Sequence, residues 1–153
     1  MNINELREHL CAEYPELCPL FSIEFGDGVL TVECDLVFKA AGDLKDLGFD
    51  RLGMVTAVDH GESFEMVYRL TSRSMSAGIF LKCHVPRSNP VTASLVPLWP
   101  AALWQEREVF DLFGIHFEGH PDLRRIFLPE DWVGHPLRKD YVDDRMIKRP
   151  DYI

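Results

Sequence analysis

The sequence predicts an α+β fold: an antiparallel sheet, a hairpin plus a meander, is covered by helices on one face and followed by a C-terminal helix and an extended partner-binding arm. Two observations carry this prediction. Residues 64–71 and 78–85 alternate apolar and polar side chains, as strands with one solvent-exposed face do. Apolar residues also recur at helical spacing before and after these runs, so helices are available to cover the apolar face.

The N-terminal residues predict a helix followed by a β-hairpin. Apolar side chains recur at helical spacing through residues 2–14, with Asn4 as the N-cap and Pro15 after the helix. The runs 22–25 and 29–34 then flank a short turn that contains two glycines, which is typical of a hairpin.

The middle of the chain predicts a second helix and three strands. Asp35 is expected to cap a helix that continues to Leu47, and Gly48 follows where a helix commonly ends. The strands are expected at residues 52–59, 64–71 and 78–85, and residues 91–98 are either a further strand or an extended loop.

A further helix is expected from Pro100 to Phe113, with Gly114 just past its end. Its apolar residues occupy more than one face, so one side can pack on the sheet while the other needs a second cover. That cover is either the tail of the chain or a partner protein. After Phe117 no long apolar periodicity remains, which indicates a semi-extended arm.

Length and composition favour one compact domain with appended elements. The chain has 153 residues, of which 46% are hydrophobic and 27% charged. It has no apolar run long enough for a transmembrane helix and no secretory signal pattern, so we expect a cytosolic protein that can still dock on a membrane assembly. We divide it into an α+β domain, residues 1–98, and a charged helix with an extended arm, residues 99–153, within one structural unit.

The net charge of −9 is unevenly distributed. Residues 1–119 carry eighteen acidic and nine basic side chains, whereas residues 120–153 carry seven of each. An acidic body argues against nucleic-acid binding, which requires a basic face. The balanced tail suits a protein interface, although a solvated surface segment has the same composition.

The four cysteines are scattered and form no CxxC motif: Cys11, Cys18, Cys34 and Cys83. Zinc or iron–sulfur ligation is therefore not expected, because it needs several thiolates brought close together. A disulfide framework is not expected either, since the chain has no export signal. We interpret these cysteines as small, mostly buried residues and expect no cofactor to be bound by this chain alone.

Charged side chains are concentrated on the helix that ends at Phe113. Arg107 and Asp111 are four residues apart and Glu108 and Asp111 are three apart, so each pair can meet on the helix surface. Carboxylates on one face can serve as an acid–base pair or as metal ligands. We favour an ion-pair network in which the helix carboxylates, Glu106 included, organise three arginines of the arm, Arg124, Arg125 and Arg138.

The histidines of this region suggest an alternative from another class, a metal-dependent hydrolase. Its ligands would be His116, His120, Asp122 and His135. Gly119 and Pro121 make a continuous helix between the first two histidines improbable. The chain also has no nucleophile elbow and no phosphate-binding loop. The residues therefore favour a structural partner in a larger assembly.

Several motifs occur in a fixed order: Glu106-Arg107-Glu108, Asp111, Phe113-Gly114-Ile115, and the runs 119–126, 128–132 and 134–141. In this order and spacing the chain resembles the C subunit of the respiratory NADH–quinone oxidoreductase, complex I. The resemblance is strongest over residues 99–141 and extends over residues 20–145.

The resemblance implies a non-catalytic structural subunit of a proton-translocating complex, located at the cytoplasmic face of the cell membrane. Such a subunit braces the quinone-site subunit, which is similar to the hydrogenase large subunit, and contacts iron–sulfur subunits. FMN, iron–sulfur clusters and quinone are then held by other subunits. The alternative within this class is the equivalent subunit of a membrane-bound nickel–iron hydrogenase, a formate hydrogenlyase or an F420-dependent dehydrogenase.

We expect one set of residues to organise the arm or meet the partner. This set is Glu106, Arg107, Glu108, Asp111, His120, Asp122, Arg124, Arg125, His135, Arg138, Lys139 and Asp140.

Overall fold

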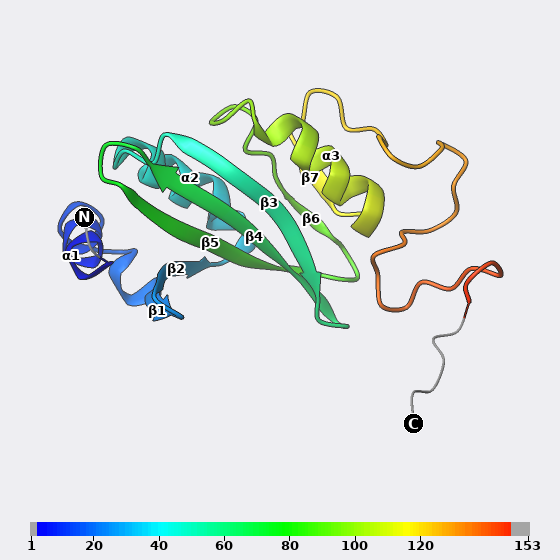
Figure 1. Cartoon of the computed structure of the whole chain (residues 1–153), viewed down its shortest axis with the longest axis horizontal. Coiled ribbons are helices and arrows are strands. Elements are labelled where there is room, and N and C mark those ends of the chain that lie inside the picture. Colours follow the sequence, from blue (N-terminus) through cyan, green and yellow to red (C-terminus); the bar gives the residue numbers. More distant parts are fainter. Residues whose placement is uncertain (1–2, 148–153) are drawn as a thin grey trace.

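The computed structural model describes residues 3–147 and contains a five-stranded sheet in the order β1-β2-β5-β4-β3 (Figure 1). Its strands are β1 (Phe21–Glu24), β2 (Asp27–Val32), β3 (Arg51–Asp59), β4 (Ser63–Ser72) and β5 (Ala77–Pro86). Together with three α-helices they confirm the predicted α+β class.

One strand pair differs from the expected antiparallel arrangement. Strands β2 and β5 are parallel, with Val32 beside Cys83, whereas the other three neighbouring pairs are antiparallel. After β2 the chain leaves the sheet through a helix and returns at the far edge as β3. The β3-β4-β5 meander then brings β5 back beside β2, in the same direction.

Helix α1 begins before its predicted cap, Asn4, and helix α2 begins after its predicted cap, Asp35. Helix α1 is Ile3–Glu13, so Asn4 lies inside it, and the predicted first residue, Asn2, lies outside the described residues. Asp35 lies in a 3₁₀ turn, η2 (Cys34–Leu36), that precedes α2 (Val37–Asp46), and no side chain caps that helix. The tighter turn completes the change of direction that we had assigned to a cap.

Helices α1, α2 and α3 (Ala102–Phe113) contribute to a single apolar core on one face of the sheet. Met66, Tyr68 and Leu81 from the sheet are fully buried there, and Leu44 of α2 and Val109 of α3 pack in the same core. On the opposite face, Glu65, Arg69, Phe80 and Lys82 are partly exposed. Phe64 meets Phe113 edge-on, with 6.2 Å between ring centres, which fixes the C-terminal end of α3 over β4.

Two short strands flank α3 and form a second, parallel pair. They are β6 (Val91–Ala93) and β7 (His116–Glu118), so the region predicted as strand or loop is a three-residue strand followed by turns. Gly114 follows the end of α3, as predicted, and has a left-handed conformation with φ of 70°. Within residues 3–147 no helix has both the length and the apolar character needed to cross a bilayer.

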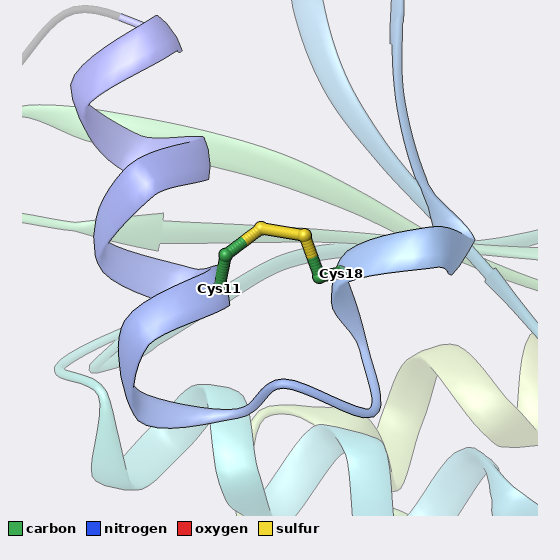
Figure 2. Close-up of a disulfide and its surroundings, with 2 residues drawn as sticks. All are labelled: Cys11 and Cys18. Carbon is green, nitrogen blue, oxygen red and sulfur yellow. A yellow bond between two sulfur atoms is a disulfide. The ribbon is translucent and has the colours of Figure 1, made fainter.

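Cys11 and Cys18 form a disulfide, contrary to our expectation (Figure 2). Cys11 lies near the end of α1 and Cys18 in the 3₁₀ turn η1 (Cys18–Leu20), with 4.8 Å between their Cα atoms. Pro15 turns the chain back between them, and this proximity was not visible from cysteine spacing alone. Cys34 and Cys83 are free thiols.

The last described part of the chain, residues 119–147, has no helix or strand and is called the C-terminal arm here. Figure 1 shows it, in orange and red, following β7, passing beside α3 and extending beyond the sheet. Residues 148–153 of the predicted second segment lie outside the described residues.

Candidate functional site

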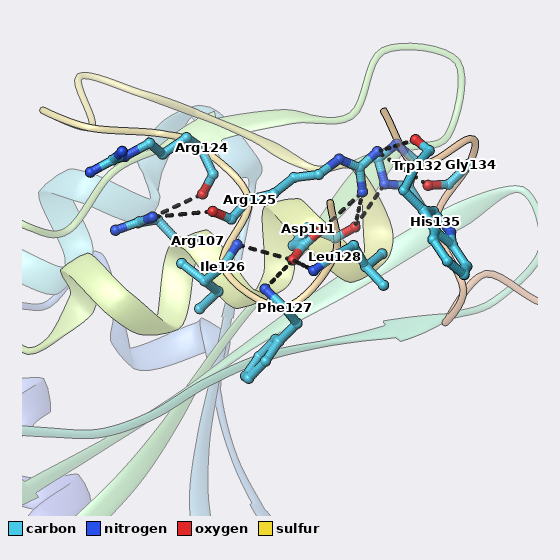
Figure 3. Close-up of polar contacts among 10 residues, drawn as sticks. All are labelled: Arg107, Asp111, Arg124, Arg125, Ile126, Phe127, Leu128, Trp132, Gly134 and His135. Carbon is cyan, nitrogen blue, oxygen red and sulfur yellow. Dashed lines mark hydrogen bonds and ion pairs between the residues drawn. The ribbon is translucent and has the colours of Figure 1, made fainter. Parts of the chain in front are cut away.

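The Asp111 carboxylate is the centre of the contacts that hold the C-terminal arm to α3 (Figure 3). Asp111 is completely buried, and one of its oxygens accepts three backbone N–H groups, from Ile126, Phe127 and Leu128, at 2.8–3.1 Å. Burial alone raises the pKa of this carboxyl, but these amides and Arg125 outweigh it, so the pKa lies below its usual value. A charged carboxylate thus fixes the backbone of the arm.

Arg125 completes this network with four hydrogen bonds from its guanidinium group. Its Nη1 donates to the Asp111 carboxylate at 2.9 Å and to the Asp111 carbonyl at 3.2 Å. Its Nη2 donates to the carbonyls of Trp132 and Gly134 further along the arm. A single planar fork therefore ties two parts of the arm to the helix end (Figure 3).

The arm also supplies partners for the last carbonyl groups of α3. These groups have no donor inside the helix and must find one elsewhere. Nδ1 of His135 donates to the Asp111 carbonyl at 3.0 Å, and the Leu137 N–H donates to the Leu112 carbonyl at 3.1 Å. Nε of Arg138 donates to the Phe113 carbonyl at 2.6 Å. The His135-Pro136-Leu137-Arg138 run is therefore a cap for the helix C-terminus.

A second anchor joins the arm to the sheet through Asp59, at the end of β3. Asp59 is buried and accepts the backbone N–H of Lys139 at 2.8 Å, the N–H of Gly61, and Nη1 of Arg87 at 2.9 Å. Burial raises the pKa of Asp59, but these donors dominate and lower it to about 2. Nη2 of the same arginine pairs with Asp140 at 2.5 Å.

Two arginines lie against the Phe64 ring at this anchor. The guanidinium carbons of Arg87 and Arg138 are 5.0 and 5.1 Å from the ring centre. These contacts add cation–π attraction to the hydrogen bonds of each arginine. The sheet, the helix end and the arm therefore meet at one aromatic side chain.

Glu106 does not organise the arginines of the arm. It is completely buried and accepts the Ser94 hydroxyl at 2.6 Å and the Leu95 N–H at 2.7 Å, which fixes the loop before α3. Burial outweighs these two hydrogen bonds and raises the pKa of Glu106 to about 7. Its place on the core-facing side of α3 turns it away from the arm.

The remaining charged residues of the predicted network occupy different positions. Arg107 is buried and donates to the carbonyls of Arg124 and Arg125, while its guanidinium stacks on Trp104. Glu108 is exposed, so it does not share a face with Asp111. Arg124 pairs with Asp122 on the surface, and Arg138 contacts helix carbonyls instead of a helix carboxylate. Only the Asp111–Arg125 pair joins a helix carboxylate to one of the three predicted arginines.

The histidines do not converge on one point. His120 accepts the Asp122 N–H through Nδ1 at 3.0 Å, so its Nε2 donates to the Leu103 carbonyl. His135 caps α3, while His116 is exposed on β7. No group of three or more metal-ligating side chains is found among residues 3–147. This geometry does not favour the metal-dependent hydrolase alternative.

Sequence reasoning missed Asp59, Arg87 and Gln105. Asp59 occupies a core-facing position at the end of an apolar strand, and a carboxylate in that position needs several donors. That signal was available in the strand pattern. Gln105 accepts the Val55 N–H at 2.7 Å on the edge strand β3, and no feature of the sequence indicated this contact.

The arm exposes apolar side chains although its backbone is fixed. Exposed fractions are 63% for Phe127, 86% for Val133 and 85% for Val142. Leu137, Met146 and Ile147 are also exposed. An ordered segment that presents a series of apolar side chains to solvent is typical of a protein-binding surface.

Residues 30–145 match the protein family described as respiratory-chain NADH dehydrogenase, 30 kDa subunit. The chain belongs to this family. The match includes α2, α3, strands β3–β7 and nearly all of the C-terminal arm, and it confirms the resemblance inferred from residues 99–141.

Relatives within the 30 kDa subunit family are similar over most of their length. The C subunit of the NADH-quinone oxidoreductase of Moorella thermoacetica is 48% identical, over 82% of this chain and 90% of the relative. The equivalent NADH-quinone oxidoreductase subunit of Trichlorobacter lovleyi is 46% identical over 76% of this chain and 75% of its own.

Two solved structures have a similar fold. The trypsin-resistant fragment 1–134 of Nqo5 is 29% identical and superposes with a TM-score of 0.67, over 80% of this chain and all of the fragment. A chain of the archaeal membrane-bound sulfane sulfur reductase is 22% identical, with a TM-score of 0.77 over 98% of this chain and 97% of its own. The second likeness concerns the fold alone.

Proposed function

We propose that this 30 kDa subunit family member is a non-catalytic brace in the peripheral arm of a proton-translocating NADH–quinone oxidoreductase. It uses the C-terminal arm to hold the quinone-site subunit and neighbouring iron–sulfur subunits at the cytoplasmic face of the membrane. FMN, the clusters and quinone then belong to those other subunits. Family membership and the names of the relatives support this assignment.

One observation carries the assignment of the interface: the arm is ordered from within the chain, yet its apolar side chains face outward. The Asp111 carboxylate fixes the backbone at residues 126–128, and Arg125 fixes it again at Trp132 and Gly134. Phe127 and Val133 remain exposed at these same places. A preorganised apolar surface binds with less loss of conformational entropy than a disordered tail does.

The expected energetic centre of this interface is apolar, with charges at its edge. Asp122, Arg124, Lys139 and Asp140 are exposed along the arm and include both signs. Charged residues at the rim of an interface contribute more to register and association rate than to affinity. The apolar side chains are therefore the better targets for a test of binding.

The test uses the tagged chain, recovered from cells with its native complex, and identification of the co-purified subunits. Val133→Asp combined with Val142→Asp is expected to release the chain from the complex without changing its thermal unfolding. Phe25→Ser is the matched control, because Phe25 is fully exposed on the β1–β2 turn, outside the arm. Equal recovery of the complex with the unaltered chain, the double variant and the Phe25→Ser control would overturn the proposed interface.

The identity of the co-purified subunits tests the assignment to complex I. An NADH-binding flavoprotein and a quinone-site subunit are expected. A nickel-containing hydrogenase large subunit in their place would contradict the NADH–quinone assignment and would favour the hydrogenase-type alternative. Stoichiometric zinc or iron in the purified chain would contradict a non-catalytic brace without its own cofactor.

A further inference from the structure

The two free thiols lie where β2 ends beside β5. Cys83 is completely buried on β5 and is the register partner of Val32, the last residue of β2. Cys34 follows two residues later, in the turn η2, and packs against the same core that contains Cys83. The parallel β2–β5 pairing, which the sequence did not predict, therefore brings the two thiols together.

Only one of these thiols is accessible from solvent. Cys34 is half-buried and lines a surface hollow of about 410 Å³, together with Val91, Thr92 and Glu118. While it is protonated, Cys34 donates to the Val91 carbonyl at 3.4 Å. Cys83 has no exposed surface and does not line the hollow. A small solute therefore reaches Cys34 first.

A buried hydroxyl beside Cys34 can stabilise a negative sulfur, against the opposing charges of Asp35 and Glu118 in the same hollow. Thr92 lines the hollow, and its buried hydroxyl has no hydrogen-bond partner of good geometry among residues 3–147. Buried hydroxyls without partners are uncommon and destabilising, so a nearby anion would relieve that cost.

The two thiols differ in acidity in the way that a reactive pair requires. Hydrogen bonding from the Cys83 thiol and from Thr92 outweighs burial and the charges of Asp35 and Glu118, so the pKa of Cys34 lies below its usual value. The same hydrogen bond and burial raise the pKa of Cys83, so that thiol stays protonated. Cys34 is the more acidic and the only accessible thiol of the pair, so it is the first to react, since the thiolate is the reactive form.

We propose that Cys34 and Cys83 form a redox-active dithiol that a hydroperoxide closes to a disulfide. The Cys34 thiolate attacks hydrogen peroxide, the O–O bond breaks, and with one proton taken up the products are a sulfenic acid and water. The Cys83 thiol then attacks the Cys34 sulfur, and the sulfenic oxygen leaves as a second water with the Cys83 proton. The two thiols together lose two electrons, which reduce the peroxide.

The test uses the full chain with Cys11→Ser and Cys18→Ser, so that Cys34 and Cys83 are the only thiols. Stoichiometric hydrogen peroxide at pH 7.5 is expected to remove both thiols, measured after denaturation, and dithiothreitol is expected to restore them. Trypsin then yields peptide 8–39 linked to peptide 83–87, because cleavage follows Arg7, Lys39, Lys82 and Arg87. Loss of thiols without this linked pair would overturn the proposal.

Single variants separate the two roles. With Cys83→Ala added, Cys34 is expected to stop at the sulfenic acid, which dimedone labels. With Cys34→Ser added, Cys83 is expected to react at least tenfold more slowly than Cys34 does. Comparable rates for the two cysteines would overturn the assignment. Cys83→Ser provides a second buried replacement, and circular dichroism establishes which variants are folded before the rates are compared.

Discussion

One nitrogen of the Arg125 guanidinium donates to both the carboxylate and the main-chain carbonyl of Asp111, at 2.9 and 3.2 Å. The arm residue thereby neutralises a buried charge and closes the end of α3 with the same group. Asp111 in turn fixes three consecutive amides of the arm. The charge pattern that separates this region from the acidic body therefore has an intramolecular role, in addition to its proposed role at the interface.

Asp111→Asn is expected to destabilise the chain by about 3 kcal/mol. The amide keeps one acceptor oxygen, so either the three backbone N–H groups or Arg125 lose their partner. Urea unfolding measures the loss, and amide hydrogen exchange should become faster at residues 126–128. Glu108→Gln, on the exposed side of the same helix, should change stability by less than about 0.5 kcal/mol. Equal losses for the two variants would rule out this role.

Gly114→Ala is expected to cost about 1–3 kcal/mol more than Gly119→Ala. Both glycines have positive φ, 70° and 81°, so backbone strain is similar in the two variants. A Cβ at Gly114 would overlap the His135 ring and meet Arg138, whereas a Cβ at Gly119 would meet no atom within 4 Å.

The difference between the two midpoints of thermal unfolding therefore isolates the packing of the arm against the helix end. The two alanine variants would show the same loss if the arm did not pack there.

Sequence reasoning located the arm because composition and motif order are local properties. It also placed Gly114 just past the end of α3, because glycine is the residue that most often follows a helix in a left-handed conformation. It did not predict the β2–β5 pairing or the Asp59 anchor, because strand order depends on contacts between residues far apart in the chain. Lys139 meets Asp59 across 80 positions, and no spacing rule predicts such a contact.

The same limit applies to the charged helix. Helical spacing places Glu106 and Asp111 among possible partners for the arginines, but only the direction of each side chain decides between core and arm. Glu106 points to the loop before the helix and Asp111 to the loop after it. The sequence alone gives two carboxylates on one element, and the packing of α3 on β3 gives them different partners.

Arg138→Ala is expected to weaken assembly more than it destabilises the isolated chain. In the isolated chain the Phe113 carbonyl loses its donor and the Phe64 ring loses one cation, a cost of about 1–2 kcal/mol. Binding also has to reorder the released arm, so recovery of the native complex should fall more steeply. Arg138→Lys keeps the charge without the planar fork, so its recovery of the native complex should lie between those of the unaltered chain and Arg138→Ala. Intact assembly with a large loss of thermal stability would contradict this expectation.

Removal of the Cys11–Cys18 disulfide is expected to cost about 2 kcal/mol, because the loop that it closes is short. Helix α1 has eleven residues and would be marginal alone, so the loss should be concentrated there. Urea unfolding of the Cys11→Ser, Cys18→Ser double variant measures the cost. Thiol titration of the purified chain should find two free thiols, Cys34 and Cys83. Four free thiols would show that the disulfide is reduced under those conditions.

Glu106 should make the stability of the chain fall as pH rises from about 4.5 to about 7. Its pKa is raised from 4.5 to about 7, so between these values the folded chain holds a proton that the unfolded chain has lost. The contribution to stability is therefore full below pH 4.5 and is lost as pH rises through 7. Glu106→Gln removes this dependence and keeps an acceptor for the Leu95 amide.

At pH 8 the Glu106→Gln variant is expected to be more stable than the unaltered chain by up to about 3 kcal/mol, and the difference should shrink towards pH 5. Urea unfolding at both pH values measures it, with Glu108→Gln as the exposed control. Asp59 and Asp111, whose pKa values are lowered, reduce stability only as the solution becomes more acidic and are present in all three proteins. They therefore cancel in the comparison. A difference between the Glu106 variant and the unaltered chain that is the same at pH 5 and pH 8 would show that Glu106 does not titrate in this range, because only a shifted carboxyl changes proton uptake between folded and unfolded states.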